Sequence, residues 1–192
     1  MQIVLASSNK HKVQEINDIV KSLNIPLEFI LPPEGFDPEE TGKTFEENSY
    51  IKALEAWKLT KIWVLADDSG LCIDALNGKP GIYSARYAET PALRIQRVLK
   101  ELNGIKNRNA HFTCAMTLIN PEGKIEYKYQ GICEGSIIEE TRGTNGFGYD
   151  PIFLVKGDTR TMAELSEDEK NKVSHRSTAL RNILEYLKKV IK

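Results

Sequence analysis

The stretch Trp63-Val64-Leu65-Ala66-Asp67-Asp68-Ser69-Gly70 decides the fold class. Four consecutive apolar residues are typical of a buried strand, and two carboxylates, a hydroxyl and a glycine follow them directly. The pattern predicts a strand that ends in a polar loop at a sheet edge, where α/β proteins commonly bind ligands. It therefore predicts an α/β protein with a site around Asp67 and Asp68.

The chain before this stretch alternates strand and helix in the same way. Residues 3–6 form an apolar run of strand length, and residues 27–31 also resemble a strand. Between them, apolar residues recur at helical spacing from Val13 to Leu23. A second helical pattern runs from Thr44 to about Thr60, with Thr41 or Thr44 placed to cap it. Lys52 projects from this predicted helix.

The chain after this stretch adds an antiparallel section. A helix is predicted over 91–102, a hairpin over 110–119 and 125–132, and further strands over 135–139 and 152–155. A last helix is expected from about Ser174. No repeat or linker separates independent parts, so we predict a single mixed α/β domain over residues 1–192.

Composition excludes several classes of function. Of 192 residues, 41% are hydrophobic and 28% charged, which is typical of a soluble globular protein. Lys plus Arg number 26 against 27 Asp plus Glu, so no overall field would hold a nucleic acid polymer or a membrane surface. No apolar run approaches the ~20 residues that span a bilayer. Three widely spaced cysteines indicate reduced thiols, so a cytoplasmic location is expected.

The polar run after the first strand is a candidate anion site. Ser7, Ser8, Asn9, Lys10, His11 and Lys12 lie between a strand and a helix, where helix-start amides, hydroxyls and cations can meet one phosphate. A solvated helix start with surface lysines explains the same residues equally well. The phosphate loop motif Gly-x-x-x-x-Gly-Lys-Ser/Thr is absent from the sequence.

Carboxylates near the deciding stretch are candidate metal ligands. Asp67 and Asp68, with Glu39 and Glu40 in an earlier loop, offer the hard oxygen ligands that magnesium takes one or two at a time. A second carboxylate beside such an ion could accept a proton from an attacking water. Solvated loop carboxylates remain the alternative interpretation.

Two later segments could recognise a flat ligand. Gly143 to Asp150 packs three glycines around Phe147 and Tyr149, which allows close backbone approach and aromatic stacking. A glycine-rich turn with core aromatics is the alternative. Lys170, Ser174, His175 and Arg176 are predicted at the start of the last helix, where donors could read a base or simply be solvated. His111, inside an apolar run, is interpreted as a strand histidine without a functional role.

Together these segments resemble the inosine triphosphate pyrophosphatase family, also called the Ham1-like family, over nearly the whole chain. The segments that carry the resemblance are Ser7-Ser8-Asn9 through Lys12, Glu39-Glu40-Thr41-Gly42-Lys43-Thr44-Phe45-Glu46-Glu47-Asn48, Ala66-Asp67-Asp68-Ser69-Gly70-Leu71, Gly78-Lys79-Pro80-Gly81 with Ser84-Ala85-Arg86, Gly146-Phe147-Gly148-Tyr149-Asp150-Pro151, and Glu169-Lys170-Asn171 with Ser174-His175-Arg176. Each segment is weakly specific, but six in the family's order make coincidence improbable.

The resemblance implies a fold and an activity. The fold is an elongated mixed α/β sheet with two lobes around a central substrate cleft, in a homodimer. The activity is magnesium-dependent hydrolysis of inosine, deoxyinosine and xanthosine triphosphates (ITP, dITP and XTP) to the monophosphate and pyrophosphate.

The resemblance also assigns roles by position. Ser7 to Lys12 and Lys52 would hold the triphosphate, Glu39 and Asp68 the Mg²⁺ ion, and Asp68 would also accept the proton. The remaining substrate contacts would be Ser69, Phe147, Gly148, Tyr149, Asp150, Lys170, His175 and Arg176. Two residues depart from the family pattern, Ser8 and Ser177, where glycine is frequent. A β-carbon at Ser8 takes room that glycine would leave to a phosphate.

Three other functions stay open from the sequence. A Maf-like pyrophosphatase acting on pyrimidine or modified nucleotides is the nearest, and the Ser174-His175-Arg176 ending argues against it. A nucleotide sensor without turnover is disfavoured by the presence of both Glu39 and Asp68. A nucleic-acid-binding module is disfavoured by the balanced charge and the lack of a basic stripe.

Overall fold

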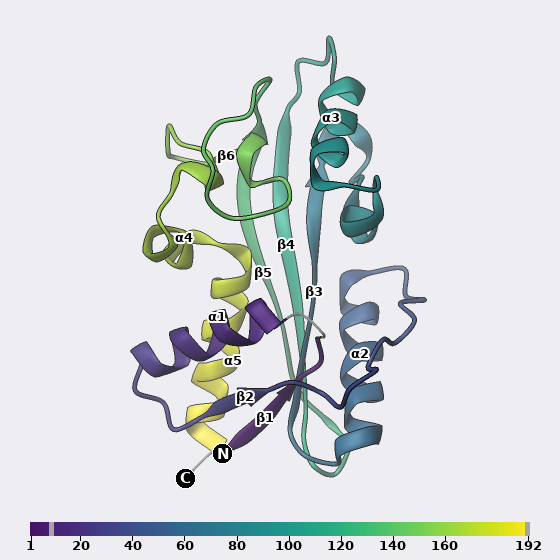
Figure 1. Ribbon diagram of the computed structural model, residues 1–192, viewed down its shortest axis with the longest axis vertical. Helices are drawn as coiled ribbons and strands as arrows, with labels where there is room; N and C mark the ends of the chain where they lie inside the picture. The colour runs from purple at the N-terminus through teal and green to yellow at the C-terminus, as the bar shows by residue number, and fades with distance from the viewer. Residues whose placement is uncertain (8–9, 191–192) are drawn as a thin grey trace. The chain divides into compact units, whose positions relative to one another are not determined.

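The computed structural model describes residues 1–7 and 10–190 and contains one six-stranded mixed sheet (Figure 1). The strand order is β2-β1-β3-β4-β5-β6. The strands are β1 Gln2–Leu5, β2 Glu28–Ile30, β3 Val64–Ile73, β4 Asn109–Ile119, β5 Ile125–Ile137 and β6 Phe153–Val155. The helices are α1 Lys10–Ser22, α2 Phe45–Thr60, α3 Pro91–Glu101, α4 Glu167–Val173 and α5 His175–Val190. The predicted mixed α/β fold class is confirmed.

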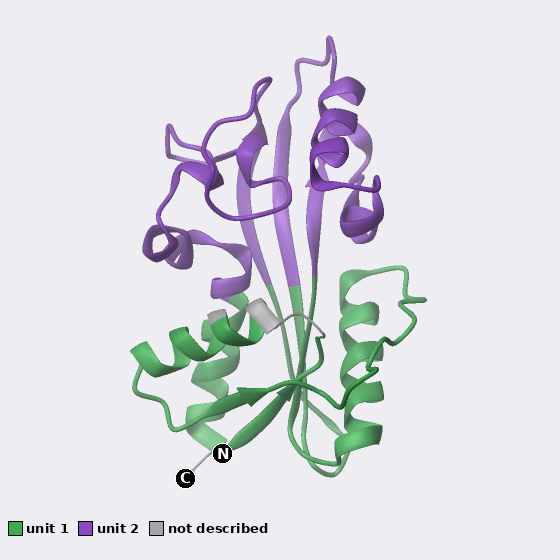
Figure 2. Ribbon diagram, viewed as in Figure 1, with its two compact units in different colours: residues 1–68, 115–130, 179–192 green, residues 69–114, 131–178 purple. Residues whose placement is uncertain are grey.

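The chain divides into two compact units (Figure 2). Unit 1 comprises residues 1–68, 115–130 and 179–192, and unit 2 comprises 69–114 and 131–178. Strands β3, β4 and β5 and helix α5 each contribute residues to both units, and the boundary on β3 falls between Asp68 and Ser69. The single domain predicted over 1–192 and its central cleft stay predictions.

Unit 1 is built on the parallel strands β2, β1 and β3. Val4 of β1 lies opposite Ile30 of β2 and Val64 of β3. Residues alternate between the two faces of a strand, so Val4 packs with Ala53 and Ala56 of α2 in one buried cluster. In Figure 1, α2 lies on one side of these strands and α1 with the C-terminal part of α5 on the other.

Helix α2 begins where the sequence predicts. Thr44 has an extended backbone and its side chain accepts a hydrogen bond from the Glu47 amide, which satisfies one of the free amides of the first turn. Lys61, in the left-handed conformation, ends the helix through a bond from its amide to the Trp57 carbonyl. The cap is thus Thr44, one of the two predicted candidates.

Unit 2 has its own apolar core. Strand β6 pairs antiparallel with the end of β5, with Ser136 opposite Leu154. Thr90 caps α3, and Val98 of this helix belongs to the same buried cluster as Leu71 and Ile73 of β3. None of the helices within residues 1–7 and 10–190 is long and apolar enough to cross a membrane.

Three predicted boundaries are wrong. The polar run after Ala66 was expected to be a loop, but β3 continues through it to Ile73, because the buried Leu71 and Ile73 prolong the apolar pattern beyond it. The separate strand predicted over 135–139 is largely the end of β5. Lys170 lies on α4, a helix of its own that begins with a capping box formed by Ser166 and Glu169, so it is not at the start of the last helix.

Candidate functional site

Two buried carboxylates lie within strand β3. Asp67 is 2% exposed and Asp68 is 8% exposed. Both oxygens of Asp67 accept hydrogen bonds from Lys12 Nζ, at 3.1 and 3.0 Å. Burying an ionised carboxylate is costly unless it is paired, and Lys12 of α1 provides that partner for Asp67.

Lys52 holds the second carboxylate together with a third one. Its Nζ lies 3.0 Å from Asp68 Oδ1 and 2.8 Å from Glu40 Oε1. We call Glu40, Asp67 and Asp68, with Lys12 and Lys52, the acid–lysine cluster. All five residues belong to unit 1.

Burial and neighbouring charges shift the pKa values of Asp68 and Lys52. Burial raises the pKa of the Asp68 carboxyl, and the neighbouring Lys52 offsets only part of that rise. Burial alone would lower the pKa of Lys52, but the three carboxylates around it raise its pKa instead. A cation placed here would therefore be attracted to the cluster.

Asn48 is a member of this site that the sequence prediction missed. Its side chain is fully buried, and its Nδ2 donates to Asp68 Oδ2 at 3.3 Å. Its Oδ1 accepts a hydrogen bond of 2.8 Å from the Gly42 amide. The available signal was helical spacing, since Asn48 precedes Lys52 by four residues and so lies on the same face of α2.

Glu39, a predicted metal ligand, is placed differently from Glu40. Of the two adjacent carboxylates, Glu40 is the one that contacts Lys52, and Glu39 is exposed. Neither residue lies in a strand or helix, so no periodicity indicated which of them would face the cluster.

The predicted anion loop is only partly described. The Ser7 amide donates to the Leu5 carbonyl at 2.7 Å, and Lys12 binds Asp67. Ser8 and Asn9 lie outside the described residues. Lys10 and His11 begin α1, but their side chains also lie outside what the structure describes.

Unit 2 holds an exposed aromatic ring flanked by cations. The Phe147 side chain is 59% exposed, with Lys170 Nζ 4.7 Å and Arg176 Cζ 5.6 Å from its ring centroid. Lys170 Nζ also binds the buried Asp150 Oδ2 at 2.6 Å, and that oxygen accepts the Phe147 amide at 2.9 Å. Gly148, at φ +63°, makes the sharp turn that this loop requires.

Unlike the exposed Phe147, Tyr149 is buried and offers no ring surface to a ligand. It is 4% exposed, and its hydroxyl donates to the Ser84 carbonyl at 2.9 Å. Burial raises the pKa of this hydroxyl to about 12. The Ser84 hydroxyl in turn accepts a hydrogen bond from the Leu71 amide on β3. Tyr149 thus ties the aromatic loop to the 3-10 helix Gly81–Arg86, which is itself attached to β3.

Of the residues predicted at the start of the last helix, Lys170 and Arg176 lie beside the Phe147 ring. Arg176 Nη2 lies 3.3 Å from Ser69 Oγ, directly after Asp68 in the chain. The buried His175 ring stacks on Phe112, with centroids 4.9 Å apart. Ser177, where the family often has glycine, is buried, and its hydroxyl bonds to Ser174.

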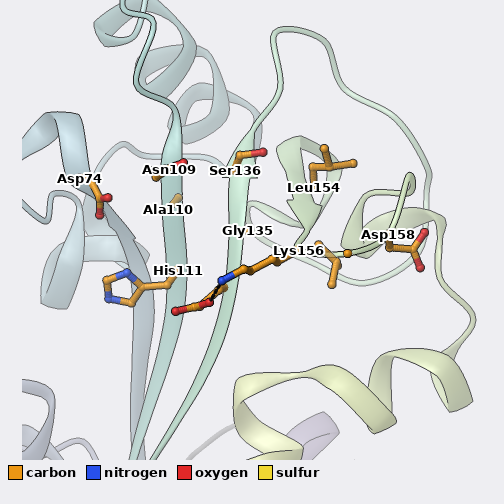
Figure 3. Close-up of a pocket in the computed structure, with 12 residues that line it drawn as sticks. Asp74, Asn109, Ala110, His111, Gly135, Ser136, Leu154, Lys156 and Asp158 are labelled. Carbon is orange, nitrogen blue, oxygen red and sulfur yellow. Dashed lines mark hydrogen bonds and ion pairs between the residues drawn. The ribbon is translucent and has the colours of Figure 1, made fainter.

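A separate cavity of about 640 Å³ in unit 2 contains none of the predicted site residues (Figure 3). His111 of β4 and Asp74 line it, as does the Glu134–Lys156 ion pair. His111 lies on a strand, as predicted, and is half-buried.

The acid–lysine cluster fits the ligand preferences of a magnesium ion. Within residues 1–7 and 10–190, no group of three His, Cys, Asp or Glu side chains is arranged as a complete metal site. Magnesium, however, usually takes one or two carboxylates and completes its shell with water and substrate phosphates. Asp68 and Glu40, bridged by one lysine, provide that smaller set.

Fold and site together define a class of protein: a mixed α/β protein with a buried acid–lysine cluster in one unit and a cation-flanked aromatic ring in the other. The family model described as the Ham1 family matches residues 3–186. The chain therefore belongs to the Ham1 family, and the resemblance predicted from the sequence is confirmed.

Relatives and solved structures agree with this membership. A dITP/XTP pyrophosphatase from Treponema denticola is 47% identical, over 98% of this chain and 99% of the relative. One from Bacillus anthracis is also 47% identical, over 96% and 95%. The structure of a HAM1 protein from Coxiella burnetii superposes with a TM-score of 0.90 at 44% identity, covering 98% of this chain and 99% of that chain. The Staphylococcus aureus Ham1 protein gives 0.89 at 39% identity, with 98% of both chains covered.

Proposed function

We propose that this protein is a nucleoside triphosphate pyrophosphatase that hydrolyses ITP, dITP and XTP to the monophosphate and pyrophosphate, and so removes non-standard purines from the nucleotide pool. The names of relatives at 47% identity over nearly the full chain support the reaction. The observation that carries the chemistry is the pair of carboxylates, Asp68 and Glu40, bridged by Lys52.

The metal-binding residues we propose are Asp68 and Glu40. Glu40 replaces Glu39 in this role because Glu40 contacts Lys52 beside Asp68, whereas Glu39 is exposed. Mg²⁺, when bound, would supply positive charge to the phosphate oxygens on which negative charge develops. Lys52 would then release part of its hold on the carboxylates and neutralise phosphate charge.

Asp68 is also the proposed proton acceptor. A general base works best when its pKa approaches the working pH, and burial moves the pKa of Asp68 in that direction. The carboxylate would orient a water for attack on the α-phosphorus and accept its proton, with pyrophosphate as the leaving group. Lys12 and the polar run from Ser7 would hold the remaining phosphates, because lysines and helix-start amides favour anions.

The base would be recognised by unit 2. Phe147 exposes a ring on which a purine could stack, and Arg176 and Lys170 beside it are hydrogen-bond donors only. Inosine and xanthosine present an acceptor oxygen at position 6, whereas adenine presents an amino donor. Adenine would leave a buried donor unpaired, at a cost of about 1–3 kcal/mol. His175, Ser69, Gly148 and Asp150 would support this contact; Tyr149 would do so from its buried position.

Two further parts of the proposal concern the assembly and the cell. We propose a homodimer in the cytoplasm, with no nucleic acid polymer and no membrane as partner. Balanced charge supports the absence of these two partners, separated cysteines support the cytoplasm, and the family resemblance supports the homodimer. Sedimentation analysis of the purified protein tests the dimer.

The decisive experiment is pyrophosphate release from ITP, XTP, dITP, ATP, GTP and dTTP, each with magnesium and with EDTA, together with analysis of the nucleotide product. We expect magnesium-dependent pyrophosphate and monophosphate from the 6-oxo purines other than GTP. Release of orthophosphate, or a preference for pyrimidines, would overturn the proposal. Tight binding of triphosphate without turnover would instead indicate a nucleotide sensor.

A further inference from the structure

Five residues of unit 1 form a closed ring of contacts. Asp68 Oδ1 binds Lys52, Lys52 binds Glu40, and two peptide bonds lead from Glu40 to Gly42. The Gly42 amide binds Asn48 Oδ1, and Asn48 Nδ2 returns to Asp68 Oδ2. Lys52 and Asn48 each connect the Glu40 side of this ring to Asp68. Lys52 bears charge, whereas Asn48 is neutral and fully buried.

The orientation of the Asn48 amide follows from its neighbours. The Gly42 amide is a donor, so the side-chain atom that it meets at 2.8 Å must be the oxygen of Asn48. The NH₂ group then faces Asp68, a carboxylate that can accept it. The two hydrogen bonds therefore fix which end of the side chain meets which partner.

Gly42 presses closely on the same amide. A β-carbon at this position would lie 2.6 Å from Asn48 Oδ1 and 2.9 Å from the Asn48 backbone nitrogen. Real β-carbons do not approach other atoms so closely, so only glycine allows the loop to reach the amide. The loop that carries Glu40 is thus held against the start of α2 through Asn48.

We propose that Asn48 is a positioning residue that sets the placement of the Asp68 and Glu40 carboxylates relative to each other for a divalent cation. This inference rests on the proposed function. Asn48 restrains Asp68 directly and Glu40 through the two-residue connection to Gly42. Hydrogen bonds that orient ligating carboxylates typically change metal affinity by ~10–100-fold when they are removed.

The test replaces the amide and measures metal binding without turnover. Asn48→Ser is too short to reach both partners, so Mn²⁺ binding to the nucleotide-free protein, followed by electron paramagnetic resonance of the free ion, should weaken by about 10-fold or more. The magnesium concentration for half-maximal pyrophosphate release should rise in parallel, with less change in kcat at saturating magnesium.

A matched control is available in the same unit. The Asn17 side chain of α1 also makes two hydrogen bonds, to the Phe29 amide and carbonyl, away from the acid–lysine cluster. Asn17→Ser should lower the unfolding temperature but leave Mn²⁺ affinity unchanged. Equal Mn²⁺ affinity in wild type and Asn48→Ser would overturn the inference, as would a wild type that binds no Mn²⁺.

A second variant covers the case in which Asn48→Ser does not fold. Gly42→Ala keeps the amide but forces the loop away from it, so Mn²⁺ affinity should fall in the same direction. Unchanged affinity in a folded Gly42→Ala protein would count against the inference. Failure of the proposed function is a different result, because it shows as absence of pyrophosphate release from wild type with any of the nucleotides.

Discussion

Removing the Lys52 ammonium should destabilise the protein far more than removing a lysine from the exposed face of the same helix. The Lys52 side chain is 13% exposed, and its partners Asp68 and Glu40 are 11% and 23% exposed. Deleting one partner of a buried ion pair costs about 3–5 kcal/mol, and an exposed pair contributes about 0–1 kcal/mol. Because Glu40 keeps some solvent, we expect Lys52→Met to lower the free energy of unfolding by about 2–4 kcal/mol near neutral pH.

The size of this effect should depend on pH with a defined sign. Burial raises the pKa of Asp68 in the folded protein above its pKa in the unfolded chain. The free energy of unfolding therefore falls as the pH rises from the lower to the higher of these two pKa values. Lys52 lowers the pKa of Asp68 in the folded protein. Without Lys52 this pKa rises further, and the free energy of unfolding continues to fall up to a higher pH. Because the pKa of Lys52 is raised, its charged form is retained at neutral pH and contributes in full to the free energy of unfolding there. The difference in unfolding free energy between wild type and Lys52→Met should therefore be small near about pH 4 and grow toward about pH 8.

The assay is urea unfolding in EDTA, followed by tryptophan fluorescence at both pH values. The control is Lys58→Met, which removes the partner of Glu55 from an exposed pair on α2, 52% and 44% exposed, and should cost under about 1 kcal/mol. A thermal melt near pH 8 should show the unfolding temperature of Lys52→Met lowered by roughly 4–16 °C. A deficit no larger than that of Lys58→Met, or one that shrinks as pH rises, would refute the reasoning.

Three other outcomes are expected. Asp68→Asn should retain its fold by circular dichroism and lose pyrophosphate release by ~10²–10⁴-fold, and near-normal turnover would remove Asp68 from its role. Tyr149→Phe, which loses the bond to the Ser84 carbonyl, should raise KM for dITP several-fold with little change in kcat, whereas Tyr87→Phe, whose hydroxyl binds Glu101, should leave KM unchanged. A thiol reagent near pH 8 should modify at most the half-buried Cys72 in the native protein, because Cys114 is buried and burial raises the pKa of Cys133 to about 11; three reactive native thiols would contradict this.

Local signals predicted most of the elements. The spacing of apolar residues predicts helix α2, and a threonine just before its first turn predicts the Thr44 cap. Both signals lie within a few residues of each other in the sequence. The capping box of Ser166 and Glu169 is an equally local signal for the separate helix α4, which the predicted last helix does not include. The Ham1 resemblance supplied the family because it used six separate segments together.

The wrong boundary at Asp67 and Asp68 has a different origin. Two adjacent carboxylates normally end a strand, since burial of charge is costly. Strand β3 continues because the buried Leu71 and Ile73 prolong its apolar pattern and because Lys12 and Lys52, 55 and 16 residues away in the chain, are partners for the two carboxylates. The positions of these two lysines cannot be predicted from the residues around position 67. The contact of Lys52 with Glu40 and not Glu39 likewise depends on a residue that is distant in the chain.

The charge of the acid–lysine cluster bears on why a cation should be needed at all. Under the proposed function, the Asp67, Asp68 and Glu40 carboxylates would lie near the bound triphosphate and repel it, since like charges repel. A divalent cation held by Asp68 and Glu40 would offset that repulsion, and Lys12 and Lys52 could then neutralise phosphate charge. We therefore expect the protein to bind its triphosphate substrate more weakly in EDTA than with magnesium. Burial also raises the pKa of Asp68, which suits a group that accepts a proton from water and is not needed for binding alone, and this supports the proposed catalysis over sensing.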